Sequence, residues 1–414
     1  MVIGARYAAA VAGGGSYWGL CFTAKAANST VTMQVYGATQ QYSPPTIHLF
    51  YSTDGISWRY FVNGADIATV TLPYVGSKVW IKAWNSGNSK ISNEYSGHKF
   101  VFTGQIAASG NIQSLLNGNE ETLSAPSYCY QNLFSGCTQL TTPPELPATT
   151  IGNSCYSYMF YGCTALSAAP ELPATSLADD CYFSMFRGCT ALSAAPDLFA
   201  RRLYIECYNQ MFYGCTSLAS PPEIRANTLE RGCCSSMFRG CSSLTTAPAL
   251  YASTAAINCY ASMFMDCTSL LSTPTVSLET TEYGCCMGMF YGCTKLTTAM
   301  SILSPLILSE NCYRSMFEGC VRLQDAPELP AEAVAVNCYA NMFYSCTALK
   351  TITVGLKSWG GAGSNLYPGT DSWVGHILGV GTFYCPTSLG SDSTISRGES
   401  ACPEGWDVVN TDAA

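Results

Sequence analysis

The chain has 414 residues, of which 48% are hydrophobic, so it is long and apolar enough to bury a large core in two or three domains. Its net charge of −8 argues against a protein that binds nucleic acid by neutralising phosphates, and no apolar run approaches the ~18 residues that would span a bilayer. It contains three histidines and none of the common nucleotide-binding, hydrolase or zinc-protease motifs. We therefore expect no enzyme, although paired carboxylates of a glycosidase would leave no local trace.

The first segment, residues 1–16, ends in a glycine-rich stretch and is interpreted as a flexible N-terminal arm. Two readings remain open: a disordered terminus, or an anchor that becomes ordered against a partner subunit. A secretory signal fits poorly because Arg6 is the only basic residue and the apolar run is short. A surface protein without an export signal fits a virion released by lysis better than a secreted protein.

Residues 17–108 predict a small β-sandwich-like domain. The runs 46–51 and 57–62 are rich in β-branched and aromatic residues and flank Asp54-Gly55, a good hairpin turn. Further strands are expected at 78–84 and 99–102. Several short strands at close spacing are typical of a sandwich. The following stretch, residues 109–122, is predicted to be a linker and N-terminal cap, in which a helical turn carries Ile112, Leu115 and Leu116.

A cysteine lattice dominates residues 123–354. Two series of nine cysteines, eight residues apart, repeat every 26 residues with one 27-residue step: Cys129, Cys155, Cys181, Cys207, Cys233, Cys259, Cys285, Cys312 and Cys338, then Cys137, Cys163, Cys189, Cys215, Cys241, Cys267, Cys293, Cys320 and Cys346. A fixed period of 20–50 residues indicates a stacked repeat array. Each unit reads approximately CYxxMFxGCTxLxxAPxLPA.

Within each unit, two periodicities predict two kinds of segment. In residues 181–189, the cysteines, Tyr182, Met185 and Phe186 share one face at 100° per residue, which predicts a short helix ended by Gly188. In residues 166–173 every second residue, from Leu166 to Leu172, is apolar and shares one face, while Glu171 lies on the other, which predicts an extended segment. One such unit cannot bury its own apolar face, so we expect an α+β, leucine-rich-repeat-like solenoid of nine units, about 45 Å long at roughly 5 Å per unit.

The repeats resemble the BspA-like leucine-rich-repeat family. The segments MFYGCTALSAAPELPATSL and MFRGCSSLTTAPALYASTA carry the resemblance, and GNIQSLLNGNE, GTFYCP and PEGWDVVN in the flanks are similar to prophage-encoded members. The resemblance covers about residues 100–410 and implies a noncatalytic display or adhesion scaffold of phage particles or bacterial surfaces. It transfers no site residues, because the matching positions belong to the core. The additional Cys-Tyr pair before Met-Phe departs from shorter repeats of the family.

The family resemblance also implies the expected partners and location. We expect an exposed fibre, decoration or adhesin component on the virion surface, joined to capsid or tail proteins through its N-terminal region and facing a host-surface glycan or protein. A homo-oligomer, such as a trimer, is a family-level expectation, and neither nucleic acid, membrane insertion nor a cofactor is expected. The alternatives are an adhesin on the bacterial surface and a virion-associated glycan depolymerase.

The cysteines have three readings. Residues eight apart on a helix are about 12 Å apart, which is too far for a disulfide, and the spacing does not suit zinc. Small buried, reduced side chains are the expected state, with disulfides between units or metal binding as alternatives. Cys385 and Cys402 lie outside the lattice and form the single pair for which we most expect a disulfide. Cys234 and Cys286 replace the tyrosine of their units, which indicates packing.

Two columns of residues are predicted on the surface. The outward column stands opposite the core face, and its candidate binding residues for a partner or glycan are Tyr161, Arg187, Tyr213, Arg239, Tyr291 and Tyr344, with Met265 and Glu318 at the remaining positions. The acidic column consists of Glu145, Glu171, Asp197 and Glu223 on the extended segments. Solvent-facing variability is the alternative for the first column. The second is interpreted as solvated carboxylates, with a bound calcium ion as the alternative.

The last segment, residues 355–414, is glycine-rich and breaks the repeat. It carries the large aromatic residues Trp359, Trp373, Phe383, Tyr384 and Trp406. Large aromatic side chains suit a C-terminal cap over the exposed apolar end of the last unit. An aromatic ligand pocket is the alternative.

Overall fold

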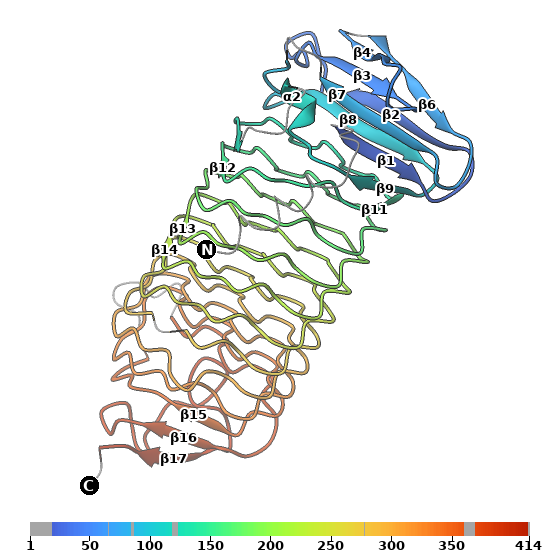
Figure 1. The fold of residues 1–414 in the computed structure, drawn as a ribbon. Helices are drawn as coiled ribbons and strands as arrows, with labels where there is room; N and C mark the ends of the chain where they lie inside the picture. Colours follow the sequence, from blue (N-terminus) through green and yellow to red (C-terminus); the bar gives the residue numbers. More distant parts are fainter. Residues whose placement is uncertain are drawn as a thin grey trace, which may run out of the picture.

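The computed structural model describes residues 19–64, 66–83, 87–117, 123–276, 278–359 and 369–412. The predicted N-terminal arm, residues 1–16, lies outside the described residues. Within these ranges, no helix combines the length and the hydrophobicity needed to pass through a bilayer. A β region is followed by a long stack of coils, and a small parallel sheet lies at the far end of the stack (Figure 1).

The β region consists of two sheets formed by short strands. The larger sheet has the order β11-β9-β1-β7-β3-β4-β5, and the smaller has the order β6-β2-β8. Their bounds are β1 Leu20–Ala24, β2 Ser29–Tyr36, β3 His48–Ser52, β4 Arg59–Asn63, β5 Asp66–Ile67, β6 Thr69–Leu72, β7 Lys78–Ala83, β8 Gly97–Thr103, β9 Ile106–Ser109 and β11 Leu140–Thr142. The hairpin predicted around Asp54 is present, since β3 and β4 pair antiparallel.

Aromatic side chains fill the space between the two sheets. The ring of Phe22, on β1, lies 4.8 Å from that of Phe100 and 5.1 Å from that of Phe102, both on β8. All three side chains are buried, and the outward positions of β7 and β8 are less so. This inward and outward alternation is the pattern expected of sheets that share one core.

The stack of coils is joined directly to the β region. Strand β11, from the first repeat, pairs in parallel with β9 and so extends the larger sheet. The predicted helical turn is present as α2, Ser114–Asn117, with Leu115 and Leu116 buried. The Phe134 ring stacks on that of Phe100 at 5.3 Å, so the two parts share one hydrophobic core.

The helix predicted in each unit is wrong, and a chain of tight turns takes its place. In the second unit the amides of Cys155, Ser157 and Met159 donate to carbonyls three residues earlier. Ser154 and Tyr158 have left-handed φ values of 51° and 56°, which a continuous right-handed helix does not contain. The helix α2 is the one α-helix among the described residues. The predicted α+β class is therefore wrong in its helical part, and the chain is built mainly of strands and turns.

The remaining amides of each turn segment bond to the next coil, which explains why no helix forms. The amides of Tyr156, Tyr158 and Phe160 donate to the carbonyls of Cys181, Phe183 and Met185, at 2.9 Å in each case. Half of the donors are thus committed to a neighbour about 25 residues ahead in sequence. Because each coil satisfies the backbone of the next, a single coil leaves those groups unpaired.

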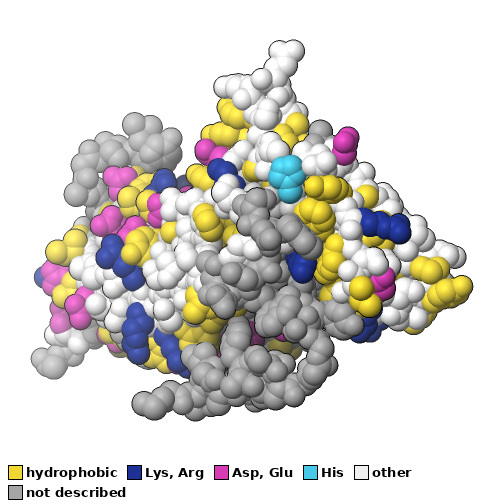
Figure 2. All heavy atoms as spheres, turned by 45° about the horizontal axis from the view of Figure 1, so that its top comes forward, with side chains coloured by type: hydrophobic (Ala, Val, Ile, Leu, Met, Phe, Trp, Pro, Cys, Tyr) yellow, Lys and Arg dark blue, Asp and Glu magenta, His cyan; other side chains and the backbone are white. Residues whose placement is uncertain are grey.

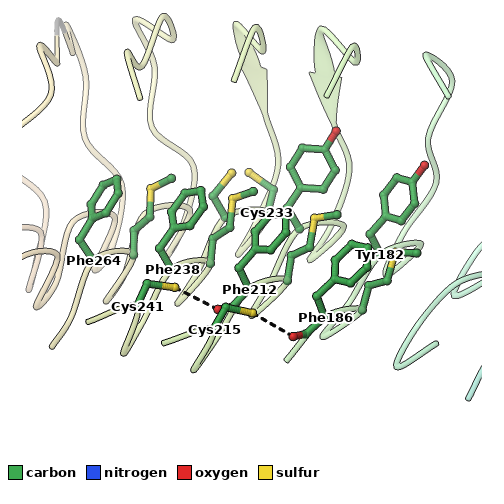
Figure 3. Close-up of a cluster of buried hydrophobic side chains, with 14 of the residues drawn as sticks. Tyr182, Phe186, Phe212, Cys215, Cys233, Phe238, Cys241 and Phe264 are labelled. Atoms are coloured by element: carbon green, nitrogen blue, oxygen red, sulfur yellow. Dashed lines mark hydrogen bonds between the residues drawn. The ribbon is translucent and has the colours of Figure 1, made fainter. Parts of the chain in front are cut away.

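Phenylalanine rings form a continuous column through the stack. The rings of Phe134, Phe160, Phe186, Phe212, Phe238, Phe264, Phe290, Phe317 and Phe343 follow one another at centroid distances of 5.4–5.7 Å, and each is fully buried (Figure 3). Successive rings are nearly parallel, with interplanar angles of 1–13°. The repeat of the sequence is therefore a repeat of packing, with one coil about every 5.5 Å.

The extended segment of each unit pairs only briefly with its neighbours. Two-residue parallel strands join β10 Ser124–Ala125 to β12 Thr150–Ile151, and β13 Arg202–Leu203 to β14 Thr228–Leu229. Isolated parallel bridges continue the pattern elsewhere, as between Leu198 and Ile224. Prolines in most units, such as Pro170 and Pro173, remove ladder donors, so the predicted extended segments form short pairs and no long sheet.

The second cysteine series forms a ladder of thiol hydrogen bonds. The thiol of Cys215 donates to the carbonyl oxygen of Phe186 at 3.1 Å, and that of Cys241 donates to Phe212 at the same distance (Figure 3). Eight cysteines of the series make this contact with the preceding coil, and Cys137 makes it with the carbonyl of Phe100 on β8, all at 3.0–3.2 Å. Burial favours a small side chain here, and the thiol adds a bond that alanine lacks.

The C-terminal aromatic residues cover the end of the stack. Trp373 is fully buried, and its ring lies 6.0 Å from Phe343 and 6.2 Å from Tyr339. The amide of Phe343 donates to the carbonyl of Trp373 at 2.7 Å, so the segment also continues the backbone pairing. Strands β15 Thr351–Thr353, β16 Thr382–Cys385 and β17 Asp407–Asn410 form a parallel sheet beside it. These contacts agree with the interpretation as a cap.

Candidate binding surface

Four residues of the outward column form an unbroken contact ladder on successive coils. The Arg187 guanidinium lies 4.4 Å from the ring centroid of Tyr213 and 5.8 Å from that of Tyr161. The Arg239 guanidinium lies 5.4 Å from the ring centroid of the same Tyr213. We name Tyr161, Arg187, Tyr213 and Arg239 the Tyr/Arg ladder. The attraction between a cation and an aromatic ring is worth about 0.5–1 kcal/mol at an exposed site, which helps to order these side chains.

The backbone fixes the position of each member of the Tyr/Arg ladder. The carbonyl of Arg187 accepts from the amide of Gly162, and the carbonyl of Tyr213 accepts from that of Gly188, both at 2.8 Å. The neighbouring residue on one side is a buried phenylalanine of the ring column. The side chain that follows this phenylalanine in the turn segment, such as Arg187, is partly exposed. The ladder is therefore as regular as the core beneath it.

Other residues extend the ladder, and the sequence reasoning missed them. The Arg187 guanidinium donates to the side-chain oxygen of Gln210, and Arg239 lies 4.0 Å from a carboxylate oxygen of Asp266. Tyr158 adds aromatic surface, with its ring 5.9 Å from Tyr161 and 5.3 Å from Phe183. Tyr158 occupies a left-handed turn position that a helix does not contain, so a helical wheel could not place it beside the column.

The structure does not join the other two predicted site residues to the Tyr/Arg ladder. Met265 follows Arg239 in the column and carries neither a charge nor an aromatic ring, so the alternation ends before Tyr291. Tyr344 instead contacts the C-terminal segment, where its hydroxyl lies 3.2 Å from Nε2 of His376 and the two rings are 4.6 Å apart. The candidate surface is therefore confined to four coils in the first half of the stack.

The side chains of the acidic column are exposed and form no cluster. Glu145, Glu171, Asp197 and Glu223 all face solvent. Glu223 pairs within its own coil with Arg225, whose Nη2 lies 2.7 Å from the carboxylate. Across the described ranges, no three His, Cys, Asp or Glu side chains converge in a manner suited to holding a metal ion. The calcium alternative thus gains no geometric support.

All 23 cysteines are buried and carry free thiols. The expected Cys385–Cys402 disulfide is therefore wrong: the Cys385 thiol contacts the carbonyl of Gly390 and the Cys402 thiol that of Pro403. Cys234 and Cys286, which replace tyrosines, are buried as predicted. Burial raises the pKa of the thiols in the second series, to about 12 for Cys137 and Cys215. Protonated thiols are poor nucleophiles and poor metal ligands.

Thiol labelling is expected to distinguish folded from unfolded chain sharply. At pH 7–8 the folded protein should react slowly with a water-soluble thiol reagent, because the sulfur atoms are enclosed. In denaturant without reductant, all 23 thiols should react. Fewer than 23 in denaturant would demonstrate disulfides, and rapid labelling of the folded chain would contradict the buried lattice.

Charged side chains are mixed on the face seen in Figure 2. Acidic and basic side chains lie next to one another there, and the described residues in this view form no broad basic area. Ion pairs such as Arg202–Glu230 at 2.7 Å and Lys357–Glu332 at 2.7 Å are exposed and contribute little to stability. The Tyr/Arg ladder differs from these pairs because both of its arginines lie over tyrosine rings, although Arg239 also approaches Asp266.

Comparison with solved structures finds a similarity to a repeat protein. A leucine-rich repeat protein from Bacteroides ovatus ATCC 8483 is similar to this chain at 17% sequence identity, with a TM-score of 0.25, over 73% of this chain and 87% of that one. No family model matches the chain, and no curated protein is significantly similar to it.

Proposed function

We propose that this chain is a noncatalytic recognition scaffold whose Tyr/Arg ladder binds a surface glycan or protein. The observation that carries the proposal is the continuous alternation of tyrosine and arginine over four coils, held at one spacing by the backbone and the ring column. Tyrosine and arginine are the residues most favoured in the energetic centres of interfaces. A tyrosine ring also presents a flat face to the apolar side of a sugar.

The spacing suits an extended ligand. Each coil advances by about 5.5 Å, judged from the phenylalanine column, so the ladder offers recurring contacts along a line. A repeating chain, either a polysaccharide or an extended peptide, can contact several such positions at once. Weak individual contacts then add up, since each further contact forms at high effective concentration.

The setting we propose for this scaffold is the surface of a phage particle, where it acts as a fibre, decoration or adhesin component. The resemblance of its repeats to BspA-like proteins supports this setting. Its N-terminal region would attach to capsid or tail proteins, and the chains would assemble as a homo-oligomer such as a trimer. A bacterial surface adhesin is the alternative setting. A glycan depolymerase is a further alternative. The three described histidines, His48, His98 and His376, contact different parts of the fold and form no common cluster that would support it.

Binding to host cells or to their isolated surface glycans tests the ladder. The double variant Arg187→Ala/Tyr213→Ala is expected to weaken binding at least tenfold, because it removes the two central contacts. The matched control is Arg322→Ala/Tyr251→Ala, which removes an exposed arginine and an exposed tyrosine outside the ladder. Equal binding by both variants would refute the proposal for this surface.

Localisation separates the three settings. A virion component should copurify in fixed ratio with a capsid or tail protein, and antibodies against it should label intact particles. Labelling of intact bacteria without particles would favour the adhesin. Release of reducing sugar from host capsule, at a rate proportional to the amount of purified chain, would favour the depolymerase.

A further inference from the structure

A separate hollow lies in the β region, where two loops meet the first coil. Its volume is about 380 Å³, and the side chains of Gln41, Tyr42, Lys90, Asn93, Glu94 and Tyr95 line it. This volume is at the lower end of the roughly 300–1,000 Å³ that small-molecule sites occupy. It lies apart from the Tyr/Arg ladder in sequence and does not depend on the function proposed for that surface.

The two loops that form the hollow are fixed to each other. The side-chain amide of Asn93 donates to the carbonyl of Ser43 at 3.1 Å, and the rings of Tyr42 and Tyr95 lie 4.5 Å apart. Gly37 has a φ of 66°, and a Cβ on it would stand 1.9 Å from the carbonyl oxygen of Tyr95. Only glycine allows this close approach, so the shape of the hollow depends on it.

The first coil supports the same loops from behind. The hydroxyl of Ser92 donates to the carbonyl of Tyr128 at 2.6 Å, and that of Tyr36 donates to the carbonyl of Gln131 at 2.9 Å. With its nitrogen turned toward the loop, the Gln131 amide donates to the carbonyls of Asn93 and Glu94 at 2.9 and 3.2 Å. These contacts hold the hollow in shape before any ligand arrives, which lowers the entropic cost of binding.

The lining combines one exposed aromatic face with polar groups of every kind. Tyr95 remains 53% exposed although the Tyr42 ring packs beside it. Asn93 and Gln41 offer amides, Glu94 offers a carboxylate and Lys90 offers an ammonium group. A hydrogen bond with Glu94 raises the pKa of the Tyr95 phenol, which places the carboxylate at the hydroxyl end of the ring.

We infer that this hollow is a carbohydrate-binding site that takes one or two pyranose rings. The apolar face of a sugar would stack on Tyr95, and its hydroxyls would pair with Glu94, Asn93 and Gln41. A sugar satisfies amides and a carboxylate at once, because each hydroxyl both donates and accepts. A purely apolar ligand would leave these groups unpaired.

The test uses the full chain and a panel of probes: glucose, galactose, mannose, N-acetylglucosamine, N-acetylgalactosamine and sialic acid, with their β1,4- and α1,4-linked disaccharides. Saturation-transfer NMR and titration calorimetry are expected to find at least one that binds with a Kd below about 10 mM. Tyr95→Ala should weaken that binding at least tenfold. Gly37→Ala should also weaken it, because the added Cβ displaces the Tyr95 backbone without removing any lining side chain.

The control is Tyr74→Ala, which removes a tyrosine that is 73% exposed in the same β region but outside the hollow. It should bind the probe as the unaltered chain does, as should the ladder variant Tyr213→Ala. Failure of every probe to bind would overturn the inference, and so would binding that survives Tyr95→Ala unchanged. Loss of binding in Tyr213→Ala, with Tyr95→Ala intact, would assign the sugar to the ladder instead.

Discussion

Phe212→Ala is expected to lower the free energy of unfolding by about 3–5 kcal/mol. The ring is fully buried and stacks on Phe186 at 5.5 Å and on Phe238 at 5.7 Å. Its removal leaves a cavity and also breaks two aromatic contacts, each contributing about 0.5–1.5 kcal/mol beyond its buried area. Because the column is continuous, neighbouring rings cannot close the gap without breaking their own register. Denaturant unfolding, followed by circular dichroism, measures the loss.

The control for this substitution is Tyr251→Ala, which truncates a tyrosine that is 57% exposed. It should change stability by less than about 0.5 kcal/mol. Phe212→Leu should fall between the two, because leucine fills much of the volume but lacks the flat ring. Equal unfolding midpoints for Phe212→Ala and Tyr251→Ala would show that the ring column does not hold the stack together.

A rise in pH from 8 to 11 is expected to unfold the protein. Burial raises the pKa of Cys137, Cys215 and Cys267 from an ordinary value of 9.0 to about 12, and raises the pKa of the other thiols in the second series as well. At a pH between the unfolded thiol pKa of 9.0 and the folded pKa of about 12, the unfolded chain has released protons that the folded chain retains. Unfolding therefore releases protons, and stability falls as pH rises.

The size of this effect follows from the number of thiols. Each one whose folded pKa exceeds its unfolded pKa lowers stability by about 1.4 kcal/mol per pH unit in this window. Between pH 9 and 11, nine such thiols together lower stability by about 12 kcal/mol per pH unit, on the order of the whole stability of a typical domain. Below pH 8 the thiols are protonated in both states, so stability should change little from this source.

Unfolding by denaturant at a series of pH values under reducing conditions checks this expectation. Cys215→Ala removes one titrating group, so its stability should fall less steeply with pH by about 1.4 kcal/mol per unit, although it starts lower. A flat unfolding midpoint between pH 8 and 11 would contradict the raised thiol pKa values. Recovery of the fold on return to pH 7 would exclude chemical damage as the cause.

The sequence was most informative where chemistry repeats. The 26-residue period predicted which side chains are buried. Phe186 and Cys189 have counterparts in all nine units and Met185 in eight, with Leu133 in the first, and only stacking encloses them. The hairpin at Asp54 and the helical turn at Leu115 were also found from local patterns. In each case the signal lay within a few residues or in exact recurrence.

The predicted helix failed for a physical reason. A spacing of Cys, Tyr, Met, Phe and Cys that fits 3.6 residues per turn also fits turns that advance four residues at a time. What separates the two is the left-handed backbone at Ser154 and Tyr158, and neither residue type signals it. The partner of the Tyr156 amide lies on another coil, so a reading of one unit could not find it.

The candidate surface was predicted in part. The fixed repeat placed Tyr161, Arg187, Tyr213 and Arg239 in one column even though the local structure was wrong, because both structures direct that position outward. The sequence could not show that the guanidinium of Arg187 lies over the Tyr213 ring. It also gave no sign of the hollow beside Tyr95, which requires loops more than 50 residues apart to meet at Gly37.

The modules at both ends of the stack make the same kinds of contact with the terminal coils as one coil makes with the next. Strand β8 presents Phe100 to the first coil: its ring stacks on Phe134, its amide donates to Leu133, and its carbonyl accepts the Cys137 thiol, as an earlier coil would. Trp373 accepts from Phe343 at the opposite end. Since every junction is equivalent, a whole 26-residue unit can be gained or lost without exposing a new end. The reach of the molecule is therefore adjustable in increments of about 5.5 Å, while the two terminal modules stay unchanged.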